Sequence, residues 1–246
     1  MRTALAIALL FVTAAHADTL FDLKTAVSRL SATQPVRGTF SRQSNTKTSG
    51  RWANHSDAHS ASIEVAHEAA GVILTIPQAL LEKAAAEEQA RNGAWNNSAS
   101  SAISQISTLA VARALDARST ILGLLNLGTR KSESRVMYQG HSVRLLVLTL
   151  HQPMTKSEGV EIGSLKTDQD ELSVWIADDN LPLAAERLRS TTAGFMMFKG
   201  HETEKTTYTF AQTADRLVFA RIERTGKGSG MGQNFQGTDV ETLTLH

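Results

Sequence analysis

From Arg135 onward the chain consists almost wholly of strand-like segments joined by short connections. Apolar and polar residues alternate along the segments, and turn sequences such as 178–182 (DDNLP) separate them. Because short connections join neighbouring strands in opposite directions, this region predicts an antiparallel sheet. The predicted strands cover 133–139, 141–151, 171–177, 183–191, 194–199, 204–212, 215–225 and 236–245. Such a sheet curves strongly and wraps around either its own side chains or a ligand.

One of these strands is apolar on both faces. Over 143–150 the sequence reads VRLLVLTL, so that Leu146 and Leu148 point one way while Leu145 and Val147 point the other. A strand with one wet face would carry polar residues at every second position. We therefore expect helices to cover one face of this strand. The other face meets either a ligand or a further layer of the protein.

The first part of the chain combines helix with strand. Apolar residues at three- and four-residue steps indicate an amphipathic helix over 19–32, with Asp18 or Thr19 as its cap. Alternating residues over 63–76 indicate a hairpin whose turn lies at 68–71. The apolar stripe of the helix needs a partner, and the curved sheet can provide it.

Two helical stretches follow the hairpin. Strong helix formers occupy 78–91, and three-to-four spacing continues over about 100–127, with Gly128 as the residue after the helix end. The fold class is therefore α+β: a strongly curved antiparallel sheet, an incomplete β-barrel, whose open side is covered or plugged by helices. We expect a single half-barrel domain over 18–246 with a helical insert at about 78–128.

Residues 1–17 have the order of an export signal. A positive start (MRT) precedes an apolar run (ALAIALLFVTA) and the small-x-small cleavage sequence Ala15-His16-Ala17. The apolar run is shorter than the roughly 20 residues that span a bilayer. We expect a mature chain that begins at Asp18 and works in the periplasm. A lipoprotein needs a cysteine at the cleavage site, and the chain has 0 cysteines. The sequence therefore predicts an exported, soluble protein that is not a lipoprotein.

Composition narrows the function classes further. The chain carries 25 Lys and Arg against 24 Asp and Glu, and without a basic surplus it is a poor match for nucleic acid. The absence of cysteine removes thiolate catalysis and cysteine-based metal sites. The sequence contains no Gly-x-Ser-x-Gly elbow of a hydrolase. These observations favour a protein that is not an enzyme and has no cofactor.

The alternating glycines of 226–232 (GKGSGMG) are not a phosphate-binding loop. Such a loop needs Gly-Lys-Ser/Thr at the start of a helix, whereas Lys227 precedes another glycine and strand-like sequence follows. We interpret this segment as a flexible connection between the last two strands.

Three short patterns, in this order, resemble a known family. An amphipathic helix is followed by 36–43 (VRGTFSRQ), then by 50–52 (GRW), and later by 172–183 (LSVWIADDNLPL). This order resembles the Lol-type (LolA/LolB-like) periplasmic lipoprotein carriers, a superfamily that includes periplasmic regulators of envelope stress. The resemblance implies an unclosed antiparallel half-barrel, with helices over its open side and an apolar cavity that holds acyl chains or other hydrophobic ligands.

The most apolar positions of the predicted helices and strands are the candidate lining of this cavity. They are Leu122, Leu125, Leu146, Leu148, Trp175, Phe195 and Met197. The function that follows is the binding of a lipid or lipoprotein acyl chain, as a carrier or chaperone in envelope biogenesis. Its partners would be a lipid or an acylated protein, with an envelope or membrane protein as a further partner. The alternative is an envelope interaction or sensor module on the same scaffold, filled by its own side chains and without a small ligand.

A third hypothesis is a metal-dependent hydrolase. On an extended strand His55, Asp57 and His59 share one face with a spacing that a metal ion can use, and His67 could join them across a hairpin. Metal sites usually need three or more convergent ligands, each oriented by a further hydrogen bond to a neighbouring group. The alternative is a polar loop in which both imidazoles are solvated, and we expect no bound metal.

Overall fold

The computed structural model describes residues 18–51, 54–90, 98–151, 164–195, 198–230 and 232–246. Within these residues the strands are β1 (Val36–Gly50), β2 (His55–Glu68), β3 (Gly71–Thr75), β4 (Gly128–Tyr138), β5 (His141–Leu150), β6 (Ser164–Ile176), β7 (Pro182–Phe195), β8 (Phe198–Gln212), β9 (Leu217–Gly230) and β10 (Gln233–Leu245). The helices are α1 (Thr19–Ser28), α2 (Gln78–Gln89), α3 (Ser98–Ser104), α4 (Thr108–Leu115) and α5 (Arg118–Leu127).

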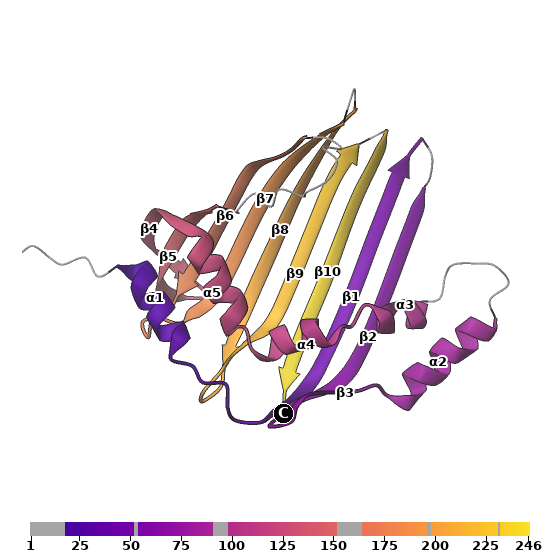
Figure 1. Ribbon diagram of the computed structural model, residues 1–246, viewed down its shortest axis with the longest axis horizontal. Coiled ribbons are helices and arrows are strands. Elements are labelled where there is room, and N and C mark those ends of the chain that lie inside the picture. The colour runs from indigo at the N-terminus through magenta and orange to yellow at the C-terminus, as the bar shows by residue number, and fades with distance from the viewer. Residues whose placement is uncertain (1–17, 52–53, 91–97, 152–163, 196–197, 231) are drawn as a thin grey trace, which may run out of the picture.

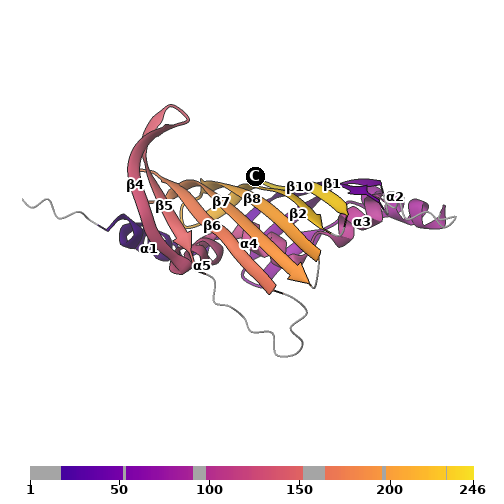
Figure 2. The same ribbon diagram turned by 90° about the horizontal axis from the view of Figure 1, so that it is seen from above.

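The strands form one antiparallel sheet in the order β3-β2-β1-β10-β9-β8-β7-β6-β5-β4. The first and last strands of this order do not pair with each other, so the sheet stays open. Figure 2 shows its curvature. The predicted α+β class with an unclosed, curved antiparallel sheet is confirmed.

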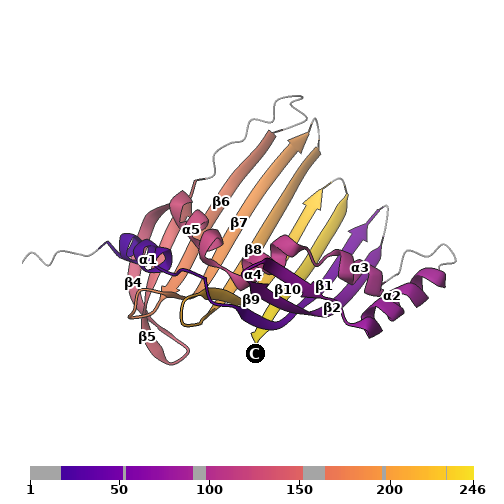
Figure 3. The same cartoon turned by 60° about the horizontal axis from the view of Figure 1, so that its bottom comes forward.

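Helices cover only part of one face of the sheet. α1, α5, α4 and α3 lie across the lower half of the strands in Figure 1, and Figure 3 shows the same helices in front of the sheet. We name the covered side the helix face, defined by Phe40, Ile63, Leu146 and Phe219, and the opposite side the outer face. The upper half of the long strands extends beyond these helices. α2 stands at the β2 side of the sheet and contains no buried residue.

The apolar core between helices and sheet consists of two clusters of buried residues. The larger cluster joins α1 and α5 to β5, β6, β8 and β9. The smaller one joins α4 to β1, β2 and β10 through residues such as Phe40, Val111 and Leu243. Both clusters lie on the helix face, which explains why the apolar residues of α4 and α5 recur at helical spacing.

The helical regions are shorter than predicted. α1 ends at Ser28, and the carboxylate of Asp18 caps it by accepting the N–H groups of Leu20 and Phe21 at 3.1 and 3.4 Å. The predicted stretch 100–127 is wrong as one helix, because polar residues that favour helix ends interrupt it. Ser107 caps α4 by accepting the N–H of Ala110, and Asp116 ends α4 in an extended conformation.

Gly128 does not end α5 in the left-handed conformation that its position suggested. Its φ and ψ are −91° and 135°, and it is the first residue of β4. Glycine is required there by space, because a Cβ would lie 2.7 Å from Leu148 Cδ1. Helix α5 therefore passes directly into the edge strand.

One strand prediction and one loop prediction near the upper end of the sheet are wrong. The segment 194–199 is not one strand, because β7 ends at Phe195 and β8 begins at Phe198, which pairs with it. The glycine-rich segment is not a loose connection, because β9 continues to Gly230 in unbroken register with β10. A side chain on Gly228 would collide with Phe235, whose ring takes that space on the paired strand. Residues 1–17, which contain the predicted export signal, lie outside the described residues.

Candidate ligand-binding face

The apolar half of the helix face is closed by the helices. Leu146, Leu148 and Leu172 belong to its floor on β5 and β6, and Val27 and Leu125 cover the floor from α1 and α5. All five side chains are 0% exposed. Burying one such side chain stabilises the fold by about 1.5–3 kcal/mol. The described state is therefore a packed interior in which the helices fill the floor.

Four of the predicted lining residues are brought together here. Leu125, Leu146 and Leu148 lie within the larger core cluster, and Leu122 packs partly buried at its margin. Two of them come from the cover helix α5 and two from the floor strand β5. The four residues therefore meet where helix α5 packs on strand β5.

Trp175 lies on the other side of the sheet. Its ring centroid is 5.6 Å from that of Tyr138, while the adjacent Val174 is buried in the core on the helix face. Neighbouring residues of a strand point to opposite faces, so Trp175 cannot line the same space as Leu146. Trp175 pairs with Leu145 on β5. The second apolar face of that strand is thus met by side chains of its neighbours and not by a helix.

Phe195 lies far from this core. It is the last residue of β7, ten positions beyond the floor residue Ala185, which corresponds to about 33 Å of extended chain. Met197 lies outside the described residues. Beyond Ala185, strand β7 runs away from the helices (Figure 1). The sequence prediction grouped Phe195 with Leu146 and Leu148, whereas the fold separates them.

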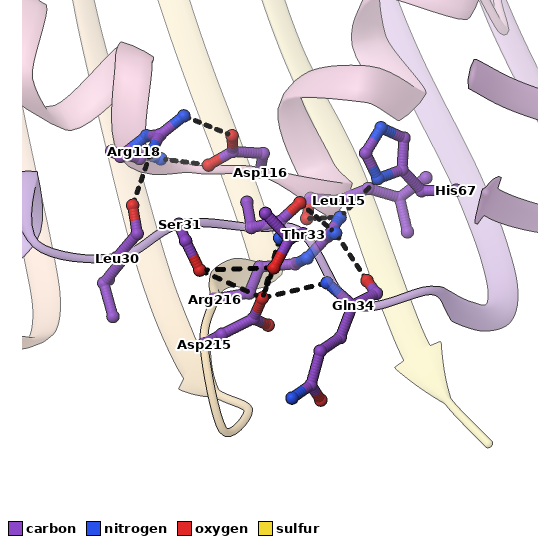
Figure 4. Close-up of polar contacts among 11 residues, drawn as sticks. Leu30, Ser31, Thr33, Gln34, His67, Leu115, Asp116, Arg118, Asp215 and Arg216 are labelled. Carbon is purple, nitrogen blue, oxygen red and sulfur yellow. Dashed lines mark hydrogen bonds and ion pairs between the residues drawn. The ribbon is translucent and has the colours of Figure 1, made fainter. Parts of the chain in front are cut away.

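A buried arginine fastens the cover helices to the sheet (Figure 4). Arg216 is 0% exposed and lies just before β9. It donates to the carbonyl oxygens of Ala32, Gln34 and Leu115 at 2.7, 2.7 and 3.2 Å and to Nδ1 of His67 at 2.8 Å. These acceptors belong to the α1–β1 connection, the end of α4 and strand β2. One side chain therefore joins the α1–β1 connection and helix α4 to strands β2 and β9.

Asp215, next to Arg216, also binds the α1–β1 connection. Its Oδ2 accepts the backbone N–H groups of Gln34 and Thr33 at 2.9 and 2.7 Å, and the hydroxyls of Thr33 and Ser31 at 3.0 and 3.3 Å. The backbone N–H of Gln34, followed by the bonds from Thr33 and Ser31, lowers the pKa of the Asp215 carboxyl against the opposing effect of burial. Arg118, at the start of α5, donates to the carbonyl oxygen of Leu30. These hydrogen bonds hold the α1–β1 connection against the turn before β9 and the start of α5 against the end of α1.

The uncovered half of the helix face is charged. Arg42 donates to both carboxylate oxygens of Asp239 at 2.9 and 3.1 Å, and Arg224 joins Asp239 to Glu241 at 3.0 and 2.9 Å. Arg42 also donates to the carbonyl oxygen of Gln105, between α3 and α4, at 2.5 Å. This ionic row begins where the apolar core stops.

A second ion pair lies further along the same face. Arg187 binds Asp170 through two bonds of 2.8 and 2.7 Å, and Asp170 is only 5% exposed. The hydrogen bonds that Arg187 donates to Asp170 raise the pKa of the Arg187 guanidinium, while burial opposes the rise. The Arg187 guanidinium therefore stays charged over the physiological range.

An open groove of about 350 Å³ adjoins the ionic row. It is lined by Ser44, Thr46, Lys47, Thr48, Glu202, Glu204, Arg224, Gly226, Phe235, Gln236, Gly237, Thr238 and Asp239, five of which carry a charge. The helix face as a whole is thus an apolar floor under helices that continues into an open, charged groove. An amphipathic molecule likewise has an apolar part and a charged or polar part.

The histidines of the predicted metal cluster are spread along strand β2. His55, Asp57 and His59 share the helix face of β2 as the alternation predicted, and Nε2 of His55 lies 2.5 Å from Oδ2 of Asp57. His67 instead receives the bond from Arg216 at the far end of the strand. Among the described residues no group of three or more His, Asp or Glu side chains could hold a metal ion.

Sequence reasoning missed the polar residues that hold the cover. Arg216 lies in the sequence ADRLVFA, where nothing distinguishes it from a solvated turn residue. Its four acceptors come from segments up to 184 positions away. Only the assembled fold reveals their convergence.

Comparison with known proteins finds distant likenesses of fold. No family model and no curated protein matches the chain. Among solved structures, the chain is similar to a LolA superfamily protein from Nitrosomonas europaea, with 10% identity, a TM-score of 0.34 and coverage of 92% of this chain and 91% of that one. It is also similar to MucB, solved in complex with MucA(peri), with 9% identity, a TM-score of 0.23 and coverage of 92% and 93%. None of the helices in the described part of the chain is long and apolar enough to cross a membrane.

Proposed function

We propose that this protein binds a hydrophobic ligand, a lipid or the acyl chain of a lipoprotein, and serves as a periplasmic carrier or chaperone in envelope biogenesis. The observation that carries the proposal is the construction of the helix face. A broad apolar floor on β5, β6, β8 and β9 is covered by short helices instead of a second sheet. Leu122, Leu125, Leu146 and Leu148 are the proposed contacts of the ligand.

Loading would require α1 and α5 to move off the floor. Exposing Leu23, Val27, Ile121 and Leu125, which are at most 1% exposed, costs about 6–12 kcal/mol at about 1.5–3 kcal/mol each. An acyl chain of about 14 methylenes gains about 11 kcal/mol at about 0.8 kcal/mol per group. The two terms are of similar size, so a ligand that replaces the cover can bind and leave reversibly.

The charged groove would receive the polar end of such a ligand. Arg224 is 35% exposed at its side chain, beside the groove and next to the end of the apolar floor. The ligand class that suits this division is an amphiphile whose chain lies under the helices.

The alternative, an interaction module without a ligand, has one observation in its favour. Leu146 and Leu148 are already fully covered by the chain's own residues. In that case α1 and α5 would stay in place, and a protein partner would contact the exposed parts of the molecule.

Mass measurement under native conditions separates the two functions. Protein purified gently from its own host should carry added mass equal to a lipid or fatty acid. After delipidation it should bind a fluorescent fatty acid such as cis-parinaric acid. Leu122→Asp places a charge at the margin of the proposed site and should weaken binding at least about tenfold, or 1.4 kcal/mol.

The matched control is Leu109→Asp on α4, where the leucine is 58% exposed and lies outside both core clusters. It should leave fatty-acid binding unchanged. A bare chain by mass that also fails to bind the fluorescent acid would end the carrier proposal and leave the interaction module.

A further inference from the structure

One edge of the sheet is left open along most of a long strand. β3 pairs with β2 only over Glu64–Glu68. No described strand pairs with the other edge of residues 55–63, although they are extended and paired with β1 throughout. Such an edge offers a row of free N–H and C=O groups to another strand.

The two long edges of the sheet differ in how they are protected. β4, at the opposite edge, has a register shift between Arg130 and Ser132, and it carries Arg130, Lys131 and Arg135. Bulges and basic side chains are the usual means of blocking strand addition. The free part of β2 has an unbroken register and contains no Lys, Arg or Pro. Only the β4 edge is therefore built to repel an added strand.

The sequence of this edge is nearly the same read from either end. Residues 56–60 are Ser, Asp, Ala, His and Ser. We propose that β2 pairs antiparallel with β2 of a second copy of this chain, about a twofold axis at Ala58. This pairing places Ser56 opposite Ser60 of the second copy and Asp57 opposite its His59.

The register follows from charge. A twofold axis perpendicular to the sheet brings residues of the same face together, so it must pass through a residue position. At Asp57 it would set two carboxylates against each other, and at His59 two imidazoles. Axes at Ser56 and at Ala58 each give two Asp–His cross-strand pairs, and opposite charges across strands are favourable. The axis at Ala58 is the one that uses His59, whereas His55 already lies 2.5 Å from Asp57 within its own chain.

The side chains of this strand suit the pairing. On the helix face Nδ1 of His59 is buried and has no hydrogen-bond partner among the described residues, and the carboxylate of Asp57 from the second copy would supply one. On the outer face Ser56, Ala58 and Ser60 are exposed and small, so their side chains leave room for a second backbone. Helix α3 contacts β2, and α2 lies across a groove from Ser60 and Ser62, so the added strand would lie beside these helices. The dimer would continue one sheet across two copies, independently of any ligand.

Engineered cysteines test the register, because the chain has no cysteine of its own. Directly opposed residues have Cα atoms about 4.5–5.5 Å apart, within disulfide range. Ala58→Cys should therefore give a covalent dimer on mild oxidation. Ser56→Cys alone should not, while Ser56→Cys combined with Ser60→Cys should. Ser134→Cys, exposed on the β4 edge, is the matched control and should stay monomeric.

Sedimentation measures the association itself. Wild-type protein should form dimers as its concentration rises, and Ala58→Lys should raise the dissociation constant at least about tenfold, whereas Ser134→Lys should not. Asp57→His or His59→Asp alone should weaken the dimer, and the two together should restore it. A wild-type chain that stays monomeric up to about 1 mM, a dimer that tolerates Ala58→Lys, or crosslinking through Ser56→Cys alone would each overturn the proposal. So would an edge found occupied by a peptide of another protein.

Discussion

Nη1 of Arg216 donates to Nδ1 of His67 at 2.8 Å, and this contact joins the turn before β9 to strand β2 across the helix face. The geometry requires Nδ1 of His67 to be unprotonated, because a protonated ring nitrogen cannot accept. The guanidinium has no carboxylate among its described partners, so its charge is stabilised by carbonyl dipoles and one imidazole. The last residue of α4, Leu115, adds the negative end of a helix to these acceptors.

Replacing Arg216 should be among the most destabilising single changes in the protein. Arg216→Met leaves the carbonyls of Ala32, Gln34 and Leu115 without this donor, and each buried group left unpaired costs about 1–3 kcal/mol. We expect a loss of about 3–5 kcal/mol in the free energy of unfolding, measured by urea denaturation. Arg221→Met is the control, because Arg221 is exposed and bonds only to Glu223. A loss for Arg216→Met no larger than that of the control would contradict the role assigned to the buried guanidinium.

Stability should fall in acid partly through Asp215. Its pKa is lowered below the usual 3.8 by the N–H of Gln34 first and then by Thr33 and Ser31. A carboxyl with a lowered folded pKa stabilises the protein above its unfolded pKa, and this contribution is lost as pH falls through the folded value. Asp215→Asn should therefore lower Tm at about pH 7, and the difference from wild type should shrink towards about pH 2–3. A difference in Tm that stays constant over this range would show that the charge of Asp215 is not involved.

The architecture could be predicted from the sequence because it depends on local patterns. Alternation over 141–151 and helical spacing over 19–32 each reflect which face a residue buries, and burial is the dominant stabilising effect. Local signals for the break of 100–127 into three helices are also present, because Ser107 caps α4 and Asp116 ends it. The apolar spacing continues through both residues, so periodicity alone predicts one helix.

The site was only partly predictable, because the face and the height at which a strand residue lies depend on how the strands pair. Leu146 and Trp175 are equally apolar, yet their places on paired strands put them on opposite faces. Phe195 is as apolar as a core residue, but it lies at the hairpin end of β7. The buried bonds of Arg216 involve partners distant in sequence, so no pattern near it could indicate them.

The closed state of the interior can be measured by truncating its leucines. Leu125→Ala removes a side chain that is 0% exposed and should cost about 2–5 kcal/mol, since the rigid floor of β5 cannot fill the cavity. Leu122→Ala, at the partly buried margin, should cost less than about 1.5 kcal/mol. Urea midpoints with unchanged slopes would give both values. Equal costs at the two positions would mean that α5 does not rest on the floor as described.

Two glycines with opposite surroundings test the packing of the sheet and of its cover. A Cβ on Gly38 would lie 2.4 Å from the carbonyl oxygen of Thr244 on the paired strand β10, and backbone atoms there cannot move aside. Gly38→Ala should therefore cost about 2–3 kcal/mol. Gly123, within α5, has no atom within 4 Å of its missing Cβ, so Gly123→Ala should stabilise the protein by about 0.5–1 kcal/mol.

Both substitutions change the unfolded chain in the same way, so the difference between them reports the folded state alone. Thermal and urea unfolding of the two variants should move in opposite directions. A stabilising Gly38→Ala would mean that β1 and β10 do not approach as closely as the register Gly38 to Leu245 requires. A destabilising Gly123→Ala would mean that the outward side of α5 is covered, which would place a further contact over the cover helix.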